Sequence, residues 1–472
     1  MKFNNIKKTN LLQTAALLEK AAENKPTKWR QLFHIMPKTG WLNDPNGLCE
    51  FKGEYHIFYQ YSPFDTKPGT NFWGHYKTKD FISYEYLSPA LCCDQVFDCH
   101  GVYSGSALID EDKMYLYYTG NVKQLGDFDY INNGREHNLV LAVSEDGEIF
   151  DDKTLLMKNS DYPSDCTCHV RDPKVFKHNN KFYMVLGSRT TDDTGEVLVY
   201  ESDNKTNWRL VNRLRTADRF GYMWECPDLF FLSGKQILVF SPQGIETEGF
   251  KYNNVYQSGW AFLEGSFTEQ GCTVGEFNEI DRGFDFYAPQ SFETSDGRRI
   301  MIGWLGLPDL EGYYENPCEK FGWSHCLTIP RELSLEGNKL IQKPLREYEN
   351  LREKDITGEN KEGIKAFETL ITYNNPEKAE ITVHSDCKIC YNNNVLTLSF
   401  GESGAGRKER SVSLEILEEL RIFCDSSSIE IFVNGGEEVF TSRFYPEKYS
   451  GIITDKNCAG FKAWKLKGFE YE

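Results

Sequence analysis

Residues 41–61 read WLNDPNGLCEFKGEYHIFYQY, and they contain the pattern that decides the fold. Within this segment, Asp44 and Pro45 are followed by a hydrophobic run and, after a turn, by a second run, YHIFYQY, that is rich in aromatic residues. Short runs of Tyr, Phe, Val and Ile between polar turns are typical of β-strands. The segment therefore predicts two adjacent strands entered through an Asp-Pro pair.

The same pattern recurs along the chain: an acidic or small residue, then Pro or Gly, then a strand, a turn and a second strand. The copies begin at Asp44-Pro45, Ser104-Gly105, Asp172-Pro173, Cys226-Pro227 and Ala288-Pro289. A second repeated element follows three of them, at Thr78-Lys79-Asp80, Ser144-Glu145-Asp146 and Ser202-Asp203-Asn204. Repeats of four-stranded size that stack around an axis form a propeller. We therefore predict five blades; the alternative is a two-sheet sandwich whose repeats are accidental.

The regions on either side of the repeats differ in pattern. Residues 1–30 begin with an amphipathic helical pattern and are expected to form an N-terminal helical extension before the propeller, which spans 31–344. Residues 345–360 are charged and predict a helical linker. Alternating strands return over 361–472, where IEIFV followed by Asn434-Gly435-Gly436 is a hairpin signal. The fold class is therefore all-β: a five-bladed β-propeller followed by a C-terminal β-sandwich, with a short N-terminal helix.

Composition narrows the class of function. The chain has 472 residues, which exceeds what a single core usually supports, and a formal net charge of -18. Such a charge argues against nucleic acid and membrane surfaces as partners. We find no secretory segment and no apolar run of roughly 18 residues, so we expect a soluble, cytoplasmic protein. The 14 cysteines are scattered without a disulfide framework, as expected for buried thiols in a reducing compartment.

Three acidic residues stand at or beside the starts of repeated units. Asp44 and Asp172 each precede a proline, and Glu225 directly precedes Cys226-Pro227. Because equivalent positions of a propeller surround one axis, we expect these acids to meet in one cavity. Glycoside hydrolysis requires two carboxyl groups, one ionised and one protonated. Met223, Trp224 and Cys226 give Glu225 an apolar surround, which makes it the candidate acid, while Arg171 is expected to keep the neighbouring Asp172 ionised.

Several motifs together resemble glycoside hydrolase family 32 over essentially the whole chain. They are WLNDPNG at 41–47, YSGSA at 103–107, RDP at 171–173, EC at 225–226, DFYAPQ at 285–290, PREL at 330–333 and, in the second domain, LRIFCDSSSIEIFVN. The resemblance implies a five-bladed propeller with a β-sandwich, in agreement with the repeat count. One position departs from the family: Tyr103 stands where many members have Phe.

The resemblance also implies roles for individual residues. It makes Asp44 the nucleophile that attacks the anomeric carbon of fructose, Glu225 the general acid/base, and Asp172 the acid that stabilises the transition state. It implies a retaining β-fructofuranosidase that needs no cofactor and no metal. The residues implied to bind sugar are Asn43, Gln60, Trp73, Tyr103, Ser104, Arg171, Tyr287 and Trp304; Trp73 and Trp304 could equally pack between blades.

The identity of the leaving group stays open at this stage. The small-molecule substrate is sucrose, sucrose 6-phosphate or a short fructo-oligosaccharide, and the N-terminal helix resembles that of bacterial sucrose-6-phosphate hydrolases. A phosphate pocket needs basic residues, for which Arg135, His137 and Arg189 are candidates. A fructan hydrolase, a fructosyltransferase and a non-catalytic sugar-binding propeller are the alternatives, the last disfavoured because all three acids are present. The sequence does not determine the oligomeric state.

Overall fold

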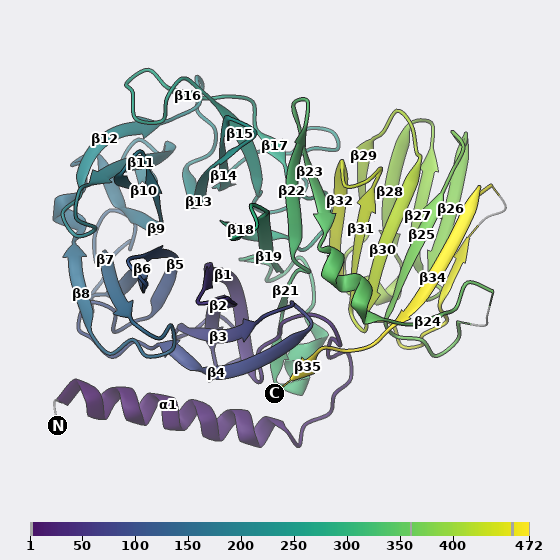
Figure 1. Ribbon diagram of the computed structural model, residues 1–472, viewed down its shortest axis with the longest axis horizontal. Helices are drawn as coiled ribbons and strands as arrows, with labels where there is room; N and C mark the ends of the chain where they lie inside the picture. Colours follow the sequence, from purple (N-terminus) through teal and green to yellow (C-terminus); the bar gives the residue numbers. More distant parts are fainter. Residues whose placement is uncertain (1–2, 359–360, 455–456, 472) are drawn as a thin grey trace.

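The computed structural model describes residues 3–358, 361–454 and 457–471. Figure 1 shows a ring of sheets around a central axis, a pair of facing sheets beside it, and a long helix along the outside of the ring. This helix is α1 (Phe3–Ala22). The predicted all-β fold of a five-bladed propeller, a C-terminal sandwich and an N-terminal helix is confirmed. Residues 1–2 of the predicted extension, 359–360 of the predicted linker, and 455–456 and 472 of the predicted sandwich lie outside the described residues.

Each blade is an antiparallel sheet whose first strand lies nearest the axis, where it contacts the first strands of both neighbouring blades (Figure 1). The second strands are the aromatic-rich runs of the repeats. In blade order the strands are β1 (Gly40–Phe51), β2 (Glu54–Ser62), β3 (Phe72–Thr78) and β4 (Ser83–Leu91); β5 (Val102–Asp110), β6 (Lys113–Lys123), β7 (Arg135–Ser144) and β8 (Lys153–Met157); β9 (Cys166–His178), β10 (Lys181–Thr190), β11 (Gly195–Ser202) and β12 (Arg209–Leu214); β13 (Met223–Leu232), β14 (Lys235–Gln243), β15 (Gly259–Glu264) and β16 (Thr273–Val274); β18 (Tyr287–Glu293), β19 (Arg299–Leu305), β22 (Arg331–Glu336) and β23 (Lys339–Pro344).

Short elements complete the ring. The strand β17 (Asn278–Glu279) pairs with β15, β20 (Trp323–Ser324) with β1, and β21 (Cys326–Leu327) with β19. The 3-10 helices of this part of the chain are η1 (Asn159–Asp161) and η2 (Pro317–Phe321). Buried apolar clusters lie between adjacent blades, so the propeller core is divided among the blade interfaces.

All five first strands shift register at the start of the repeated unit, close to the axis. At three of these bulges the residue before proline has a left-handed backbone: Asp172 at φ 64°, Cys226 at φ 48° and Ala288 at φ 46°. Residues before proline normally stay extended, and the left-handed region costs about 1–2 kcal/mol per non-glycine residue. Bulges re-aim side chains and are frequent near active sites. In these three blades the repeated pattern is therefore a strained turn at the axis.

The sandwich consists of two facing antiparallel sheets with a continuous apolar core between them (Figure 1). The first sheet follows η3 (Arg346–Leu351), so the predicted helical linker contains one short helix and the first strand of the sandwich. In spatial order this sheet has β24 (Arg352–Asp355), β34 (Gly460–Leu466), β25 (Phe367–Thr372), β30 (Glu419–Asp425), β31 (Ser428–Val433) and β32 (Glu438–Arg443). The second has β29 (Glu409–Ser413), β28 (Val395–Phe400), β27 (Cys387–Asn392), β26 (Lys378–Val383) and β33 (Ile452–Thr454), with η4 (Glu402–Gly404) between β28 and β29.

Both end segments pack on the first blade. Glu19 of α1 accepts hydrogen bonds from the Tyr61 hydroxyl at 2.8 Å and the Tyr86 hydroxyl at 2.5 Å. The last strand, β35 (Glu470–Tyr471), pairs in parallel with β4 after the chain has left the sandwich. Within the described ranges, no helix is both long and apolar enough to cross a membrane.

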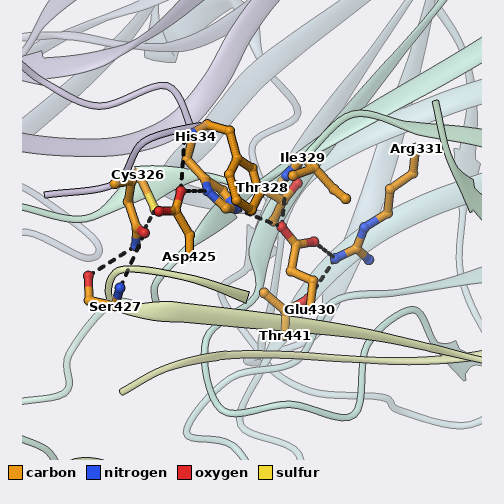
Figure 2. A network of polar contacts seen from close by, with 12 residues as sticks. His34, Cys326, Thr328, Ile329, Arg331, Asp425, Ser427, Glu430 and Thr441 are labelled. Carbon is orange, nitrogen blue, oxygen red and sulfur yellow. Dashed lines mark hydrogen bonds and ion pairs between the residues drawn. The ribbon is translucent and has the colours of Figure 1, made fainter. Parts of the chain in front are cut away.

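A buried polar network joins the propeller to the sandwich (Figure 2). His34, which precedes β1, contacts Asp425 at 2.8 Å and Glu430 at 3.1 Å, one with each ring nitrogen. Arg331 of the fifth blade pairs with Glu430 at 2.8 Å. These charged groups are almost fully buried, so each depends on its partners rather than on water.

This network predicts a pH-dependent stability. Burial alone would lower the pKa of His34, but Asp425 and Glu430 raise it to about 9. Because the pKa of His34 is higher in the folded chain than its unfolded value of 6.5, protonated His34 stabilises the fold. This contribution is fully present below pH 6.5 and is lost as pH rises through about 9. We expect the His34→Gln variant to lose on the order of 3 kcal/mol at pH 6 and much less at pH 9.5, measured by urea unfolding at both pH values. An equal loss at the two pH values would contradict the assignment.

Candidate active site

A pocket of about 450 Å³ opens at the centre of the ring, where the first strands begin. It lies over a small axial cavity whose walls contain residues from the starts of all five repeats. The structure thus places the repeat positions around one axis, as a propeller requires. The pocket is lined by Trp41, Asn43, Asp44, Gln60, Pro68, Asn71, Tyr103, Ser104, Arg135, His169, Arg171, Asp172, Glu225, Cys226, Gln243, Tyr287, Trp304, Pro308 and Asp309.

Cys226 connects the three acidic residues of the pocket. Its backbone N–H donates to Asp172 Oδ2 at 3.0 Å, and its Sγ atom lies 3.7 Å from Asp44 Oδ2 and 3.6 Å from Asp172 Oδ2. Glu225 is the preceding residue on β13. Three blades therefore contribute one acid each to the same pocket.

Asp44 is held from two sides at the bulge of β1. The Ser104 hydroxyl donates to Asp44 Oδ2 at 2.5 Å, and the Asn43 amide donates to Asp44 Oδ1 at 3.1 Å. Burial raises the pKa of Asp44, the two hydrogen bonds oppose that shift, and the charge of Glu225 adds to it. These two donors also fix the carboxylate in place, which a nucleophile requires.

Asp172 lies in the left-handed bulge of β9, where its own backbone N–H donates to the Thr119 hydroxyl at 3.0 Å. Burial raises the pKa of Asp172 to about 7; Arg171 opposes this shift and Glu225 contributes to it. Of the three acids, it is the most deeply buried, with 7% of its surface exposed. It can therefore form hydrogen bonds with a bound sugar at the bottom of the pocket.

Glu225 accepts hydrogen bonds from three residues on different strands. The Tyr287 hydroxyl donates to Oε2 at 2.6 Å and the Gln243 amide donates to the same atom at 2.8 Å. Arg171 donates to Oε1, at 2.5 Å from Nη2. Arg171 was expected to help keep Asp172 ionised, and its Nε atom does form an ion pair with that carboxylate at 3.8 Å. The sequence did not predict that the hydrogen bonds of Arg171 to a carboxylate would go to Glu225, on the first strand of the next blade.

Seven of the eight residues predicted to bind sugar line the pocket: Asn43, Gln60, Tyr103, Ser104, Arg171, Tyr287 and Trp304. Trp73 does not. It lies on β3, away from the axis, is fully buried, and packs against Phe58 at 5.9 Å and Tyr118 at 6.3 Å between ring centroids. Its indole N–H donates to the Tyr103 carbonyl at 3.1 Å. Trp73 therefore packs between blades, which was the alternative to sugar binding predicted for it.

The sequence prediction omitted several pocket residues, most notably Gln243 and His169. Gln243 ends the second strand of the fourth repeat. Its position in the repeat could have predicted that it lies near the axis. His169 Nδ1 accepts a hydrogen bond from Arg171 at 2.6 Å, and its Nε2 lies 3.0 Å from the Tyr130 carbonyl, which orients the Arg171 guanidinium. The sequence did not predict a place for His169 in the pocket, because His169 acts there through its contact with Arg171.

The three candidates for a phosphate pocket occupy different places. Arg135 lines the pocket. His137 is fully buried behind the wall, with its ring 5.8 Å from that of Tyr103. Arg189 pairs with Asp193 at 2.6 Å and lies outside the pocket lining. Only Arg135 faces the active-site pocket.

The chemistry of the pocket defines a class of enzyme. One carboxylate, Asp44, is positioned by two donors, and a second carboxyl group, Glu225, lies on an adjacent part of the wall with a different set of partners. Two carboxyl groups in distinct environments, in a pocket lined by aromatic and amide side chains, are what hydrolysis of a glycosidic bond requires. The class is that of the glycoside hydrolases.

Comparisons with known proteins identify the family. Residues 34–344 match the glycosyl hydrolases family 32 N-terminal domain, and residues 362–468 match the family 32 C-terminal domain. The chain therefore belongs to glycosyl hydrolases family 32. It is 40% identical to a sucrose-6-phosphate hydrolase of Bacillus subtilis (strain 168), over 93% of this chain and 94% of the relative.

Two solved structures have a similar fold. The structure of sucrose-6-phosphate hydrolase from Lactobacillus gasseri superposes with a TM-score of 0.86 at 30% identity, covering 97% of this chain and 96% of that one. A mutant of a Bombyx mori GH32 β-fructofuranosidase, in complex with sucrose, superposes with a TM-score of 0.83 at 28% identity and 99% coverage of both chains.

Proposed function

We propose that this protein is a retaining β-fructofuranosidase that cleaves sucrose 6-phosphate and sucrose through a covalent fructosyl-enzyme. The observation that carries the proposal is the pair of differently held carboxyl groups: Asp44 at the axis, held by Ser104 and Asn43, and Glu225 on the wall, held by Tyr287 and Gln243. The relatives named above are sucrose-6-phosphate hydrolases, and a structural neighbour binds sucrose.

In the first step, an oxygen of Asp44 attacks the anomeric carbon of the fructosyl unit. Glu225 donates a proton to the glycosidic oxygen as the bond to the leaving sugar breaks. Asp44 then carries the fructosyl group as an ester, and Glu225 is left ionised. Arg171, 2.5 Å from Glu225 Oε1, stabilises the charge that the carboxylate gains in this step.

In the second step, Glu225 takes a proton from a water molecule, whose oxygen attacks the same carbon and releases fructose from Asp44. Both carboxyl groups return to their starting protonation states. Asp172, next to Asp44 through Cys226, accepts hydrogen bonds from fructose hydroxyl groups and stabilises the positive charge that develops on the ring in both transition states. Gln60, Tyr287 and Trp304 complete the proposed fructose site.

The protein as a whole is proposed to act in the cytoplasm and to consist of a helical extension at 1–30, a catalytic propeller at 31–344, a linker at 345–360 and a sandwich at 361–472. All 14 cysteines are among the described residues, and no disulfide joins any two of them. Free thiols in this number are typical of a reducing compartment. The network around His34 supports a sandwich that docks permanently on the propeller.

Product analysis tests the proposed reaction. We expect the purified protein to release fructose from sucrose and from sucrose 6-phosphate, and the first fructose detected by ¹H NMR to be the β-furanose, because two displacements retain configuration. Initial release of the α-anomer would contradict a covalent intermediate. Binding of either sugar without cleavage would contradict enzymatic function and favour the sugar-binding alternative.

A further inference from the structure

One cationic side chain in the active-site pocket has no anionic partner. Arg135 opens β7 and lines the pocket, yet it forms no ion pair with any carboxylate among the described residues. Its Nε atom is buried and has no hydrogen-bond partner in the structure. Buried polar groups in native proteins are almost always satisfied, so an unpartnered guanidinium nitrogen that faces a pocket indicates a missing acceptor.

The surroundings of Arg135 are also cationic. Lys123 is its direct neighbour across the β6–β7 ladder, and the Lys123 side chain lies near the Tyr130 ring, 5.7 Å from its centroid. Burial, together with the nearby charge of Arg171, lowers the pKa of Arg135. Like charges placed opposite each other on paired strands destabilise a sheet. In a chain with a formal net charge of -18, this concentration of positive charge favours the binding of an anion.

The position of Arg135 relative to the catalytic acids indicates which half of a substrate it would meet. Asp44 and Asp172 come from first strands at the axis, whereas Arg135 opens the third strand of its blade and lines the same pocket. Arg171, whose charge acts on Arg135, contacts Glu225, the proposed proton donor to the leaving group. Arg135 is therefore linked through Arg171 to the residue that acts on the leaving group in the proposed mechanism.

We propose that Arg135, assisted by Lys123, binds the phosphate of a phosphorylated leaving sugar and so makes the enzyme prefer sucrose 6-phosphate to sucrose. This proposal rests on the proposed function. A phosphate monoester adds between one and two negative charges and three acceptor oxygens, and the planar guanidinium group binds two of these oxygens at once.

Arg189 and Arg407, two other cations considered for this role, are already neutralised. Arg189, another sequence candidate, pairs with Asp193 at 2.6 Å. A neighbouring cavity of about 550 Å³ shares Trp41 and Asp309 with the active site, but Arg407 in its wall is paired with Asp285 at 2.7 Å. The wall of that cavity also contains the acidic residues Asp309, Glu311, Glu315 and Glu319. These carboxylates disfavour a phosphate group in that cavity.

The test compares two arginine variants of the full chain, Arg135→Gln and Arg189→Gln. The readout is the ratio of kcat/KM for sucrose 6-phosphate to kcat/KM for sucrose. A general loss of activity or of folded protein lowers both values equally and so cancels in this ratio. We expect Arg135→Gln to lower this ratio by about 10- to 100-fold, the usual range for losing charge-assisted hydrogen bonds. Arg189→Gln is the matched control, because its guanidinium is paired outside the pocket, and its ratio is expected to stay within about 2-fold of the parent.

A second readout measures the phosphate site without cleavage of a phosphorylated substrate. Glucose 6-phosphate is expected to inhibit sucrose hydrolysis by the parent more strongly than glucose does, and this difference is expected to shrink in Arg135→Gln and to return partly in Arg135→Lys. An unchanged ratio in Arg135→Gln, or equal kcat/KM values for the two substrates in the parent, would overturn the phosphate site and leave the fructofuranosidase proposal standing. Cleavage of neither substrate would overturn both.

Discussion

Replacing Asp44 by Asn is expected to lower kcat for sucrose 6-phosphate by about four orders of magnitude or more, because the fructosyl-enzyme cannot form without the carboxylate. The amide keeps the size of the side chain, and Ser104 can still donate to its carbonyl oxygen, 2.5 Å away in the parent carboxylate. The measurement is single-turnover release of the leaving sugar. Denatured parent and variant are compared by mass spectrometry after a brief mixing with substrate, and only the parent is expected to carry a fructosyl adduct.

The same variant is not expected to lose stability. Burial raises the pKa of Asp44, which means that the ionised side chain is less favourable in the folded than in the unfolded chain. Removing the charge should therefore keep Tm at or above that of the parent at pH 7. Asp193→Asn, on the surface, serves as the control substitution of the same type. A variant at position 44 that kept its Tm and more than about 1% of the parental kcat would point to Asp172 as the nucleophile.

Replacing Glu225 by Gln is expected to lower kcat/KM for sucrose by about 10²- to 10⁴-fold, because the glycosidic oxygen then leaves without a proton. The loss should depend on the leaving group. With p-nitrophenyl β-fructofuranoside, whose nitrophenolate leaves without protonation, formation of the fructosyl-enzyme should be much less affected. A burst of nitrophenol, followed by slow turnover, is the expected time course.

The Tyr287→Phe variant weakens the surroundings of Glu225 without removing the acid, and its activity is compared with that of Glu225→Gln. It removes one donor, 2.6 Å from Glu225 Oε2, but keeps the acid and the Gln243 hydrogen bond at 2.8 Å. We expect a loss of about 10-fold, well below that of Glu225→Gln, with the pH profile of kcat/KM shifted. Equal losses for sucrose and for the nitrophenyl substrate in Glu225→Gln would assign the proton transfer to another residue.

Much of the fold could be predicted because its signals are local in sequence. Each blade repeats a strand entrance, a turn and an aromatic-rich second strand, and these depend on proline geometry and on hydrophobic alternation over a few residues. Once the repeat was counted, the symmetry of a propeller was sufficient to predict that Asp44, Asp172 and Glu225 share a cavity. The residues of the sugar site were predicted from a family resemblance. Trp73 was among them, but in the structure it packs between blades and does not line the pocket.

The sequence by itself therefore determined the number of blades, the order of the two domains and the three acids that share the pocket, since all of these follow from repetition along the chain. Only the tertiary structure decided which side chains become partners across blades: Arg171 with Glu225, Gln243 with Glu225, and Arg135 with none of the described carboxylates. Such pairings depend on β-bulges, which change the direction in which a side chain points. A bulge shifts the register by one residue, and the partner that results is set by the neighbouring blade, which lies far away in the sequence.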